Sequence, residues 1–408
     1  MKVKLNVGSL FAGVGGVCLG MKTAQNQEAE FNLVWANEID EYACETYRTN
    51  FDHTLLEGDL NLILKPSLVL EKISELTMQL NSVTDESHKK IIKKSLAKLK
   101  TQYESKYYEK MHDTILNDKI DLLNGGFPCQ AFSIAGAQKG FEDDRGNLFL
   151  SIIELINQLG EKHGKPRFLF LENVKNLHSH DNGKTYKVIK NELEKAGYII
   201  KEYVLNTMHY SDLPQNRERL YIIGFLNNSD SLKFDLFEKI DEFKVNKTPQ
   251  DRINDIQSII NHTNVEDRKY YYTPDRYPRY FAPTRDMIRN EDTSIINLEQ
   301  SINESFQFYQ LRRSKYVRKN KSNVCPTLTA NMGTGGHNVP IILVSDGIRK
   351  LTPSEAFKLQ GFPIGNGYSL PSNFNSKPYG DAHLYKQAGN SVSIPIIKMI
   401  SEQILNII

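Results

Sequence analysis

The sequence predicts an α/β fold with a doubly wound sheet, and three features lead to that prediction. Short apolar runs that read as buried strands alternate with amphipathic helical patterns through the first half of the chain. A glycine-rich turn joins the first strand to the first helix, as in the βαβ units of parallel sheets. The chain of 408 residues is also long enough for one large core or for two to three ordinary ones.

The first elements follow in the order strand, glycine loop, helix and strand. Residues 4–7 are β-compatible, and the apolar run 33–36 is followed two residues later by Glu38. Together they form a βαβ unit of about 35 residues. Further buried strands are expected at 121–123, 168–171 and 220–223, with helices at 148–159 and 185–196.

Residues 65–119 interrupt this alternation. They hold 11 lysines against 8 acidic residues, no glycine, and apolar positions at helical spacing. We expect two helices with a hairpin at residues 81–87. A solvated helical insertion and a partner-binding arm both fit. The insertion is favoured, because charged amphipathic faces are usually plain surface.

The composition changes again after residue 227. Residues 227–260 are polar and mix both charges, which indicates a domain boundary. Tyrosines gather in residues 269–281, where core packing is favoured over base contact. Residues 307–323 carry six basic residues and no acid, and a glycine-rich loop ending at His337 follows. A local basic surface is therefore expected in this second part of the chain.

The overall composition excludes several classes of protein. The 51 basic and 49 acidic residues give a net charge of +2, so the chain has no strongly basic coat. The four cysteines include no CxxC pair, which argues against a zinc site and against a disulfide framework. Residues 7–21 resemble a signal peptide, but five glycines interrupt them. We expect a soluble, cytoplasmic protein without a metal site.

The first candidate site is the glycine loop 9–16, SLFAGVGG, between the first strand and helix. Such a loop lets the backbone approach a ligand. It departs from the dinucleotide fingerprint because Cys18 replaces the third glycine. Glu38 is placed to hold ribose hydroxyls, and Asp59 offers a second acid for an adenine amino group. An adenosine-containing cofactor fits these residues, and a purely structural turn is the alternative.

Three further motifs carry reactive side chains. Cys129 follows a strand end in a Gly/Pro loop, where its thiolate could act as a nucleophile, although a lone cysteine is more often a buried apolar residue. Glu172 follows an apolar strand at the same sheet edge and could act as an acid. Arg217 and Arg219 precede another strand and supply donors with a permanent charge, or form a salt-bridged turn.

Taken together, these motifs resemble those of the C5-cytosine DNA methyltransferases of bacterial restriction-modification type. The motifs span residues 8–397 in the family's order. They are SLFAGVGG, NEID, GDL, GGFPCQAFS, FEDDRGNLF, LENVKN, QNRERLY, RKLTPSEAFKLQGFP and QAGNSVSIP. Two departures stand out. Ser9 replaces the aspartate of many members, and the insertion at 65–119 is unusually long.

The resemblance implies a Rossmann-like, S-adenosylmethionine-dependent methyltransferase sheet with a smaller target-recognition domain. It implies a catalytic domain at 1–245, a recognition domain with hinge at 246–375, and a returning segment at 376–408. S-adenosyl-L-methionine is the implied cofactor. The implied cofactor residues are Phe11, Ala12, Gly13, Gly15, Glu38 for the ribose, Ile39, Asp59 and Leu60 beside the adenine, Pro128, Leu148, Asn390 and Ser391.

The resemblance also implies a mechanism. The target cytosine is flipped out of the duplex, and the Cys129 thiolate adds to its C6. Protonated Glu172 binds N3, Arg219 holds O2 and Arg217 orders the pocket. The base that removes the C5 proton is not identified.

The implied partner is double-stranded DNA, bound by a chain that acts as a monomer, with a restriction endonuclease as functional partner. The implied DNA contacts are Gln130, Ser133, Arg312, Arg313, Lys315, Arg318, Thr327, Thr329 and His337. Three alternatives remain. The first is an NAD-dependent dehydrogenase, and the missing third glycine argues against it. The second is a tRNA methyltransferase, which would share the motifs. The third is a non-catalytic DNA-binding relative, which would be expected to lose Cys129 or Glu172.

Overall fold

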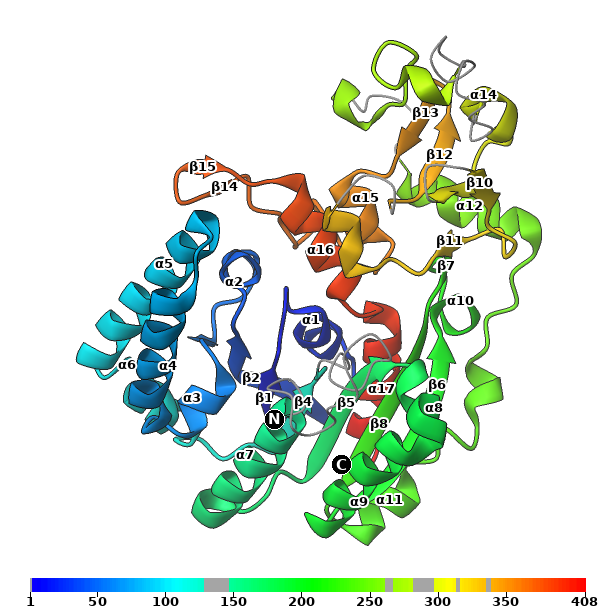
Figure 1. Cartoon of the computed structure of the whole chain (residues 1–408). Coiled ribbons are helices and arrows are strands. Elements are labelled where there is room, and N and C mark those ends of the chain that lie inside the picture. Colours follow the sequence, from blue (N-terminus) through cyan, green and yellow to red (C-terminus); the bar gives the residue numbers. More distant parts are fainter. Residues whose placement is uncertain (1, 128–146, 261–266, 282–296, 313–315, 335–338) are drawn as a thin grey trace.

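A computed structural model describes residues 2–127, 147–260, 267–281, 297–312, 316–334 and 339–408. Its main feature is a seven-stranded sheet in the order β3-β2-β1-β4-β5-β8-β6 (Figure 1). The first five strands in that order run parallel, whereas β8 is antiparallel to both β5 and β6. The strands are β1 Val3–Leu10, β2 Ala29–Glu38, β3 Thr54–Glu57, β4 Leu122–Gly125, β5 Phe168–Val174, β6 Ile199–Asn206 and β8 Glu218–Phe225.

This mixed sheet confirms the α/β class and all five strands expected from apolar runs. The strands β3 and β6 were not expected, since β3 has only four residues and the β6 sequence IIKEYVLN lies mostly at intermediate exposure. The antiparallel direction of β8 matters most for the site. It pairs Glu172 with Tyr221 and Val174 with Arg219, so the start of β8 lies at the carboxyl end of β5.

Helices cover both faces of the sheet. On one face, α7 Asn147–His163 and α9 Lys184–Lys195 pack against alternate strand residues in one core cluster. On the other face, α1 Gly16–Lys22 packs against the C-terminal α17 Ile394–Leu405. A Cβ at Gly20 would lie 2.6 Å from Ile397, so only glycine permits this close approach. The last helix of the chain thus completes the core of its first domain.

The insertion contains the expected helical hairpin and one helix more. The hairpin consists of α4 Leu68–Ser82 and α5 Glu86–Glu104, and Asp85 caps α5 by accepting from the His88 N–H at 2.7 Å. The helices α3 Leu60–Leu64 and α6 Tyr107–Ile115 flank it. The short α6 was not expected, because its sequence YYEKMHDTI carries few apolar residues.

A second, four-stranded antiparallel sheet has the order β10-β9-β12-β13. Four of the five tyrosines expected to pack in the core are buried, namely Tyr270, Tyr271, Tyr272 and Tyr280, and Tyr277 is partly buried. The strands are β9 Phe308–Arg312, β10 Tyr316–Lys319, β12 Ile341–Val344 and β13 Gly347–Lys350. The helices around this sheet are α12 Pro249–Ile259, α14 Leu298–Ser301 and α15 Pro353–Lys358.

The remaining elements are short. They are α2 Glu41–Arg48, α8 Asn176–Ser179, α10 Thr207–Tyr210, α11 Asn228–Lys233, α16 Asp381–Asn390, and the paired strands β7 Gln215–Asn216 with β11 Cys325–Pro326 and β14 Asn373–Phe374 with β15 Lys377–Pro378. The β7–β11 pair links the chain just before β8 of the seven-stranded sheet to the chain between β10 and β12 of the four-stranded sheet (Figure 1). None of the helices described is long and apolar enough to cross a membrane.

Ser9 and Cys18, the two residues of the glycine-loop region that depart from the expected motifs, are hydrogen-bonded to each other. Ser9 donates to Asn124 Oδ1 at 2.8 Å and accepts from the Cys18 thiol at 3.3 Å. Tyr47 Oη lies 3.0 Å from Cys18 Sγ and 2.6 Å from His53 Nε2. A buried polar chain therefore runs from β4 through α1 and α2 to His53.

His53 at the end of this chain predicts an acid-sensitive contribution to stability. Burial, with the nearby Lys22 charge, lowers the pKa of His53 to about 4, whereas an unfolded histidine titrates near 6.5. The neutral imidazole therefore stabilises the fold above about pH 6.5, and that contribution is lost as the pH falls towards 4. We expect the free energy of unfolding to fall less steeply over this range in His53→Gln. Urea titrations at stepped pH measure this slope, with exposed His88→Gln as control; equal slopes in both variants would contradict it.

Candidate active site

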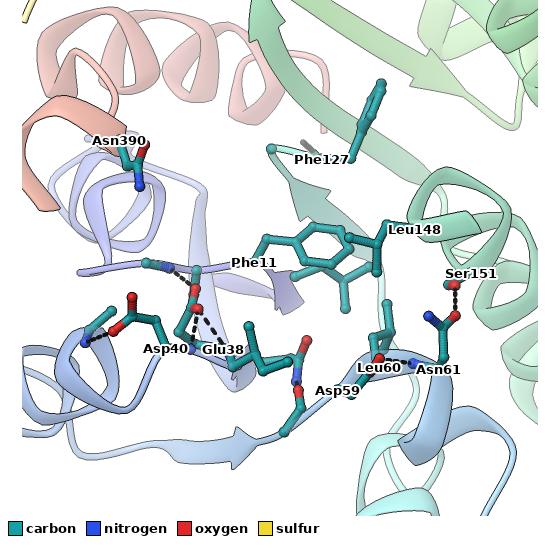
Figure 2. Close-up of a pocket in the computed structure, with 18 of the residues that line it drawn as sticks. Phe11, Glu38, Asp40, Asp59, Leu60, Asn61, Phe127, Leu148, Ser151 and Asn390 are labelled. Atoms are coloured by element: carbon teal, nitrogen blue, oxygen red, sulfur yellow. Dashed lines mark hydrogen bonds between the residues drawn. The ribbon is translucent and has the colours of Figure 1, made fainter. Parts of the chain in front are cut away.

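A cavity of about 1460 Å³ opens at the carboxyl ends of β1, β2, β4 and β5 (Figure 2). This edge is where open α/β sheets bind their ligands. Most residues predicted for the site line this one cavity. They are Phe11, Ala12, Gly13, Glu38, Ile39, Asp59, Leu60, Leu148, Glu172, Arg217, Arg219, Asn390 and Ser391.

The glycine loop bends sharply at the end of β1. Phe11 has a positive φ of 52°, a conformation that side chains rarely adopt and that is concentrated at functional sites. Its ring points towards Leu148 in Figure 2. Gly15 is the exception among the predicted loop residues, because it does not line the cavity. A Cβ there would lie 2.2 Å from the Phe51 ring, so Gly15 permits close packing behind the loop.

Glu38 at the end of β2 is held by backbone donors. Its Oε1 accepts from the N–H groups of Ile39 and Asp40, and its Oε2 accepts from Gly13, all at 2.8 Å. The residue is 9% exposed, and burial raises the pKa of its carboxyl group while the backbone hydrogen bonds oppose that shift. Glu38 thus ties the glycine loop to β2 and presents fixed acceptor oxygens to the cavity.

Apolar side chains face the same space. Ile39 is 64% exposed although it lines the cavity, which leaves an apolar surface without a protein partner among the described residues. Leu60 and Phe11 lie nearby in Figure 2, beside Asp59. Asp59 caps α3 through its Oδ1, which accepts from Asn61 N–H at 2.9 Å. This combination of apolar faces and carboxylate edges suits a heteroaromatic ring.

The acid at the end of β5 forms an ion pair across the antiparallel strand. Glu172 Oε1 lies 3.0 Å from Arg219 Nε, and the two side chains are 13% and 12% exposed. Arg219 also donates from Nη1 to the Glu218 carbonyl at 2.8 Å. The pair therefore sits in the cavity wall with both groups still reachable.

Arg217 has a different environment from Arg219. It is 2% exposed, and its guanidinium donates to the carbonyls of Leu328 at 2.9 Å, Gly389 at 3.4 Å and Ser391. Burial, together with the nearby Arg219 charge, lowers the pKa of Arg217 to about 9, so it stays charged at neutral pH. Arg217 thus joins two backbone segments beside the cavity, at Leu328 and at the end of α16, through three carbonyls.

Asn173 is a site residue that the sequence interpretation did not single out. Its Nδ2 donates to the carbonyl of Phe127 at 2.9 Å, and its Oδ1 accepts from Val174 N–H at 2.8 Å. The side chain is 3% exposed. Asn173 therefore fixes the chain where it leaves β4, just before residue 128. Its position beside Glu172, at the end of an apolar strand, is the signal that could have identified it.

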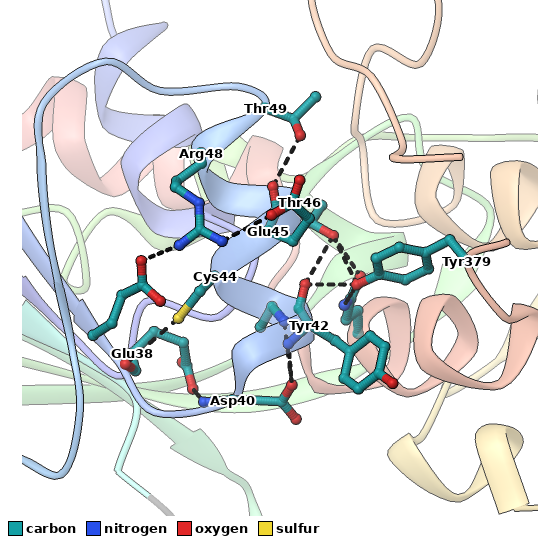
Figure 3. Close-up of polar contacts among 12 residues, drawn as sticks. Glu38, Asp40, Tyr42, Cys44, Glu45, Thr46, Arg48, Thr49 and Tyr379 are labelled. Carbon is teal, nitrogen blue, oxygen red and sulfur yellow. Dashed lines mark hydrogen bonds and ion pairs between the residues drawn. The ribbon is translucent and has the colours of Figure 1, made fainter. Parts of the chain in front are cut away.

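The C-terminal segment is joined to the cavity through α2 (Figure 3). Asp40 caps α2 by accepting from the N–H groups of Tyr42 and Ala43, and Lys386 of α16 pairs with it at 2.6 Å. Thr46 donates to Gln387 Oε1 at 3.0 Å and lies 3.3 Å from Tyr379 Oη. These contacts hold the end of α16, and with it Asn390, beside the glycine loop.

The residues predicted to contact DNA do not line this cavity or are not described. Arg318 donates to Gln310 Oε1 at 2.6 Å across the second sheet, where Arg312 ends β9. Thr327 donates to the Asn216 carbonyl at 2.7 Å, and Thr329 donates to Asn331 Oδ1. The predicted residues Pro128, Cys129, Gln130, Ser133, Arg313, Lys315 and His337 lie outside the described residues.

Comparisons with known proteins identify the family. The family model described as C-5 cytosine-specific DNA methylase matches residues 5–77 and 67–406. The type II methyltransferase M.Bsp6I of Bacillus sp. (strain RFL6) is 39% identical over 401 residues, which cover 98% of each chain. M.HhaI of Haemophilus parahaemolyticus is 30% identical over 401 residues, covering 97% of this chain and 92% of the relative.

Solved structures share the fold at lower sequence identity. The Spodoptera frugiperda DNMT2 mutant matches with a TM-score of 0.57 and 17% identity, over 98% of this chain and 99% of its own. The Entamoeba histolytica methyltransferase EhMeth matches with a TM-score of 0.55 and 17% identity, over 99% of both. The family match excludes the dehydrogenase alternative. The chain belongs to the C-5 cytosine-specific DNA methylase family and is a DNA cytosine-5-methyltransferase.

Proposed function

We propose that the chain transfers a methyl group from S-adenosyl-L-methionine to C5 of a cytosine that it flips out of a short, specific duplex sequence. The observation that carries this proposal is the single cavity that holds both Glu38 with Asp59 and the Glu172–Arg219 pair. One set suits an adenosyl group and the other suits the polar edge of a pyrimidine. A cavity with both sets brings a methyl donor to a base.

The residues fit the proposed cofactor. Glu38 offers buried carboxylate oxygens to ribose hydroxyls, and the exposed Ile39 offers an apolar face to the adenine ring. Asp59 and Leu60 would flank that ring, and Asn390 and Ser391 would close the site from the C-terminal segment. When bound, the cofactor supplies an electrophilic methyl group on its sulfonium. The chain's own residues must then make C5 of cytosine nucleophilic.

We assign that task to Cys129, Glu172 and Arg219. The Cys129 thiolate forms a bond to C6, and the C5–C6 π electrons become available at C5 for the methyl group. Glu172, protonated, hydrogen-bonds N3 and prevents negative charge from accumulating on the ring, while Arg219 holds O2. Removal of the C5 proton then expels Cys129 and restores the double bond. Cys129 follows Phe127, which lines the cavity at the end of β4.

The remaining proposals concern DNA. Residues 246–375 would form the recognition domain and its hinge, between a catalytic domain at 1–245 and the returning segment 376–408. Phosphate contacts from its basic residues would supply affinity, and polar side chains would supply specificity. We also propose that the chain acts as a monomer beside a cognate restriction endonuclease, and the type II methyltransferases among the relatives support the second part of this proposal.

Transfer of label from S-adenosylmethionine to unmethylated duplex DNA tests the proposal. We expect label in cytosine, loss of transfer in Cys129→Ala, and no label in a parallel tRNA reaction. Sequencing the product would then reveal the target site. Label only in tRNA would mean that the proposed recognition domain binds RNA and not DNA. No label, with cofactor still bound, would refute the mechanism.

A further inference from the structure

The helical insertion contributes a wall to the same cavity that holds the proposed cofactor residues. Seven of the lining positions come from the start of the insertion. They are Lys65, Leu68, Glu71, Lys72, Ser74, Glu75 and Met78. The insertion is therefore part of the site's boundary and not only a surface addition.

The cavity side of α4 is one face of the helix. Val69 is buried, and Ile73 and Leu76 pack against the same core cluster, so these three residues face the core. Residues 68, 71, 72, 75 and 78 recur at intervals of three and four, which places them along a neighbouring stripe. Leu70 is 53% exposed and does not line the cavity. The helix thus has a core face, a cavity face and a solvent face.

The insertion, which forms this wall, is attached to β3 and α3, on either side of Asp59. The short α3 begins at Leu60, directly after Asp59, and advances only about 7.5 Å before the turn to α4. Tyr107 donates to the Glu57 carbonyl at 2.7 Å, and a His112 ring nitrogen lies 3.0 Å from the Ile63 carbonyl. These contacts from α6 hold the whole insertion against β3 and α3.

The opposite wall of this part of the cavity is α7. Its lining residues include Leu150, Ile153, Glu154 and Asn157. Glu154 lies 3.8 Å from Lys65 at the base of α4, which joins the two walls. The cavity therefore continues between α4 and α7 beyond Leu60. Its volume of about 1460 Å³ exceeds the roughly 300–1,000 Å³ of ordinary small-molecule sites, so the cavity can hold an extended ligand that reaches α4.

We propose that the first two turns of α4 form the outer wall of the cofactor site and contact the adenosyl half of the bound cofactor. Leu68 offers an apolar surface near Leu60, and the Lys72–Glu75 pair at 2.6 Å offers a donor and an acceptor to the edge of the nucleoside. The assignment rests on the proposed function, because it presumes that the adenosyl group lies at Asp59. It gives the long insertion a role in holding the nucleoside.

Two adjacent tryptophan substitutions test this contact in the full chain. Glu71→Trp places an indole on the cavity face, and Leu70→Trp places one on the solvent face of the same turn. The chain's one native tryptophan, Trp35, is 1% exposed and common to both variants. Titration with S-adenosylhomocysteine, followed by fluorescence and by calorimetry, then reports proximity without requiring turnover.

We expect a saturable fluorescence change in Glu71→Trp that is absent from Leu70→Trp and follows the calorimetric binding curve. Equal responses in the two variants, with S-adenosylhomocysteine binding intact in the unmodified chain, would overturn the wall assignment and leave the proposed function standing. No calorimetric binding in the unmodified chain would instead refute the cofactor proposal, and the wall assignment with it.

Discussion

Glu172→Gln is expected to slow methyl transfer by about 10²–10⁴-fold, the usual contribution of a positioned acid. Glutamine keeps the size of the side chain but cannot carry the proton that the proposed mechanism places at N3. It also removes the negative partner 3.0 Å from Arg219, in a wall where both side chains are only 13% and 12% exposed. Single-turnover methylation with labelled cofactor measures the loss directly.

A matched control lies nearby in the sequence. Glu218→Gln makes the same chemical change in a side chain that is 43% exposed and pairs with Lys175 at 2.8 Å. It does not line the cavity, and exposed pairs contribute little. Its rate should match that of the unmodified enzyme, and S-adenosylhomocysteine should bind both variants equally. A Glu172→Gln enzyme as fast as Glu218→Gln would remove Glu172 from the chemistry.

Much of this site could be predicted from the sequence because its residues stand at strand ends. Glu38 and Glu172 each follow an apolar run, and the carboxyl ends of neighbouring parallel strands meet at one sheet edge. The structure brings both into one cavity. Local signals were sufficient there, since a strand and the residue after it are adjacent in the chain.

Roles that depend on distant partners could not be predicted in this way. The residues around Arg217 predicted only a charged donor or a salt-bridged turn, and its pocket-ordering role came from the family resemblance, because its partners at Leu328, Gly389 and Ser391 lie 111 to 174 residues away. The direction of β8 likewise depends on which strands flank it. Helical spacing predicted the hairpin in the insertion, but nothing in that spacing could tell which face of α4 lines the cavity.

The contacts of Arg217 predict the largest loss of stability among the substitutions considered. Arg217→Met keeps an unbranched side chain but removes the donors from three buried carbonyls, and each buried acceptor left unpaired costs about 1–3 kcal/mol. Burial disfavours the charged guanidinium and lowers the pKa of Arg217, so removing the charge offsets part of the loss in stability. The net decrease in the free energy of unfolding is expected to be about 2–4 kcal/mol.

The matched substitution Arg48→Met separates this loss from the general effect of removing an arginine. Arg48 is 43% exposed and pairs with Glu45 and Glu57 at the surface, so its replacement should cost less than about 1 kcal/mol. Guanidinium denaturation of both variants gives the comparison. Because Ser391 lines the cavity, Arg217→Met should also weaken S-adenosylhomocysteine binding, whereas Arg48→Met should not. If both variants unfold and bind alike, the three carbonyls do not need the guanidinium, and the ordering role assigned to Arg217 is wrong.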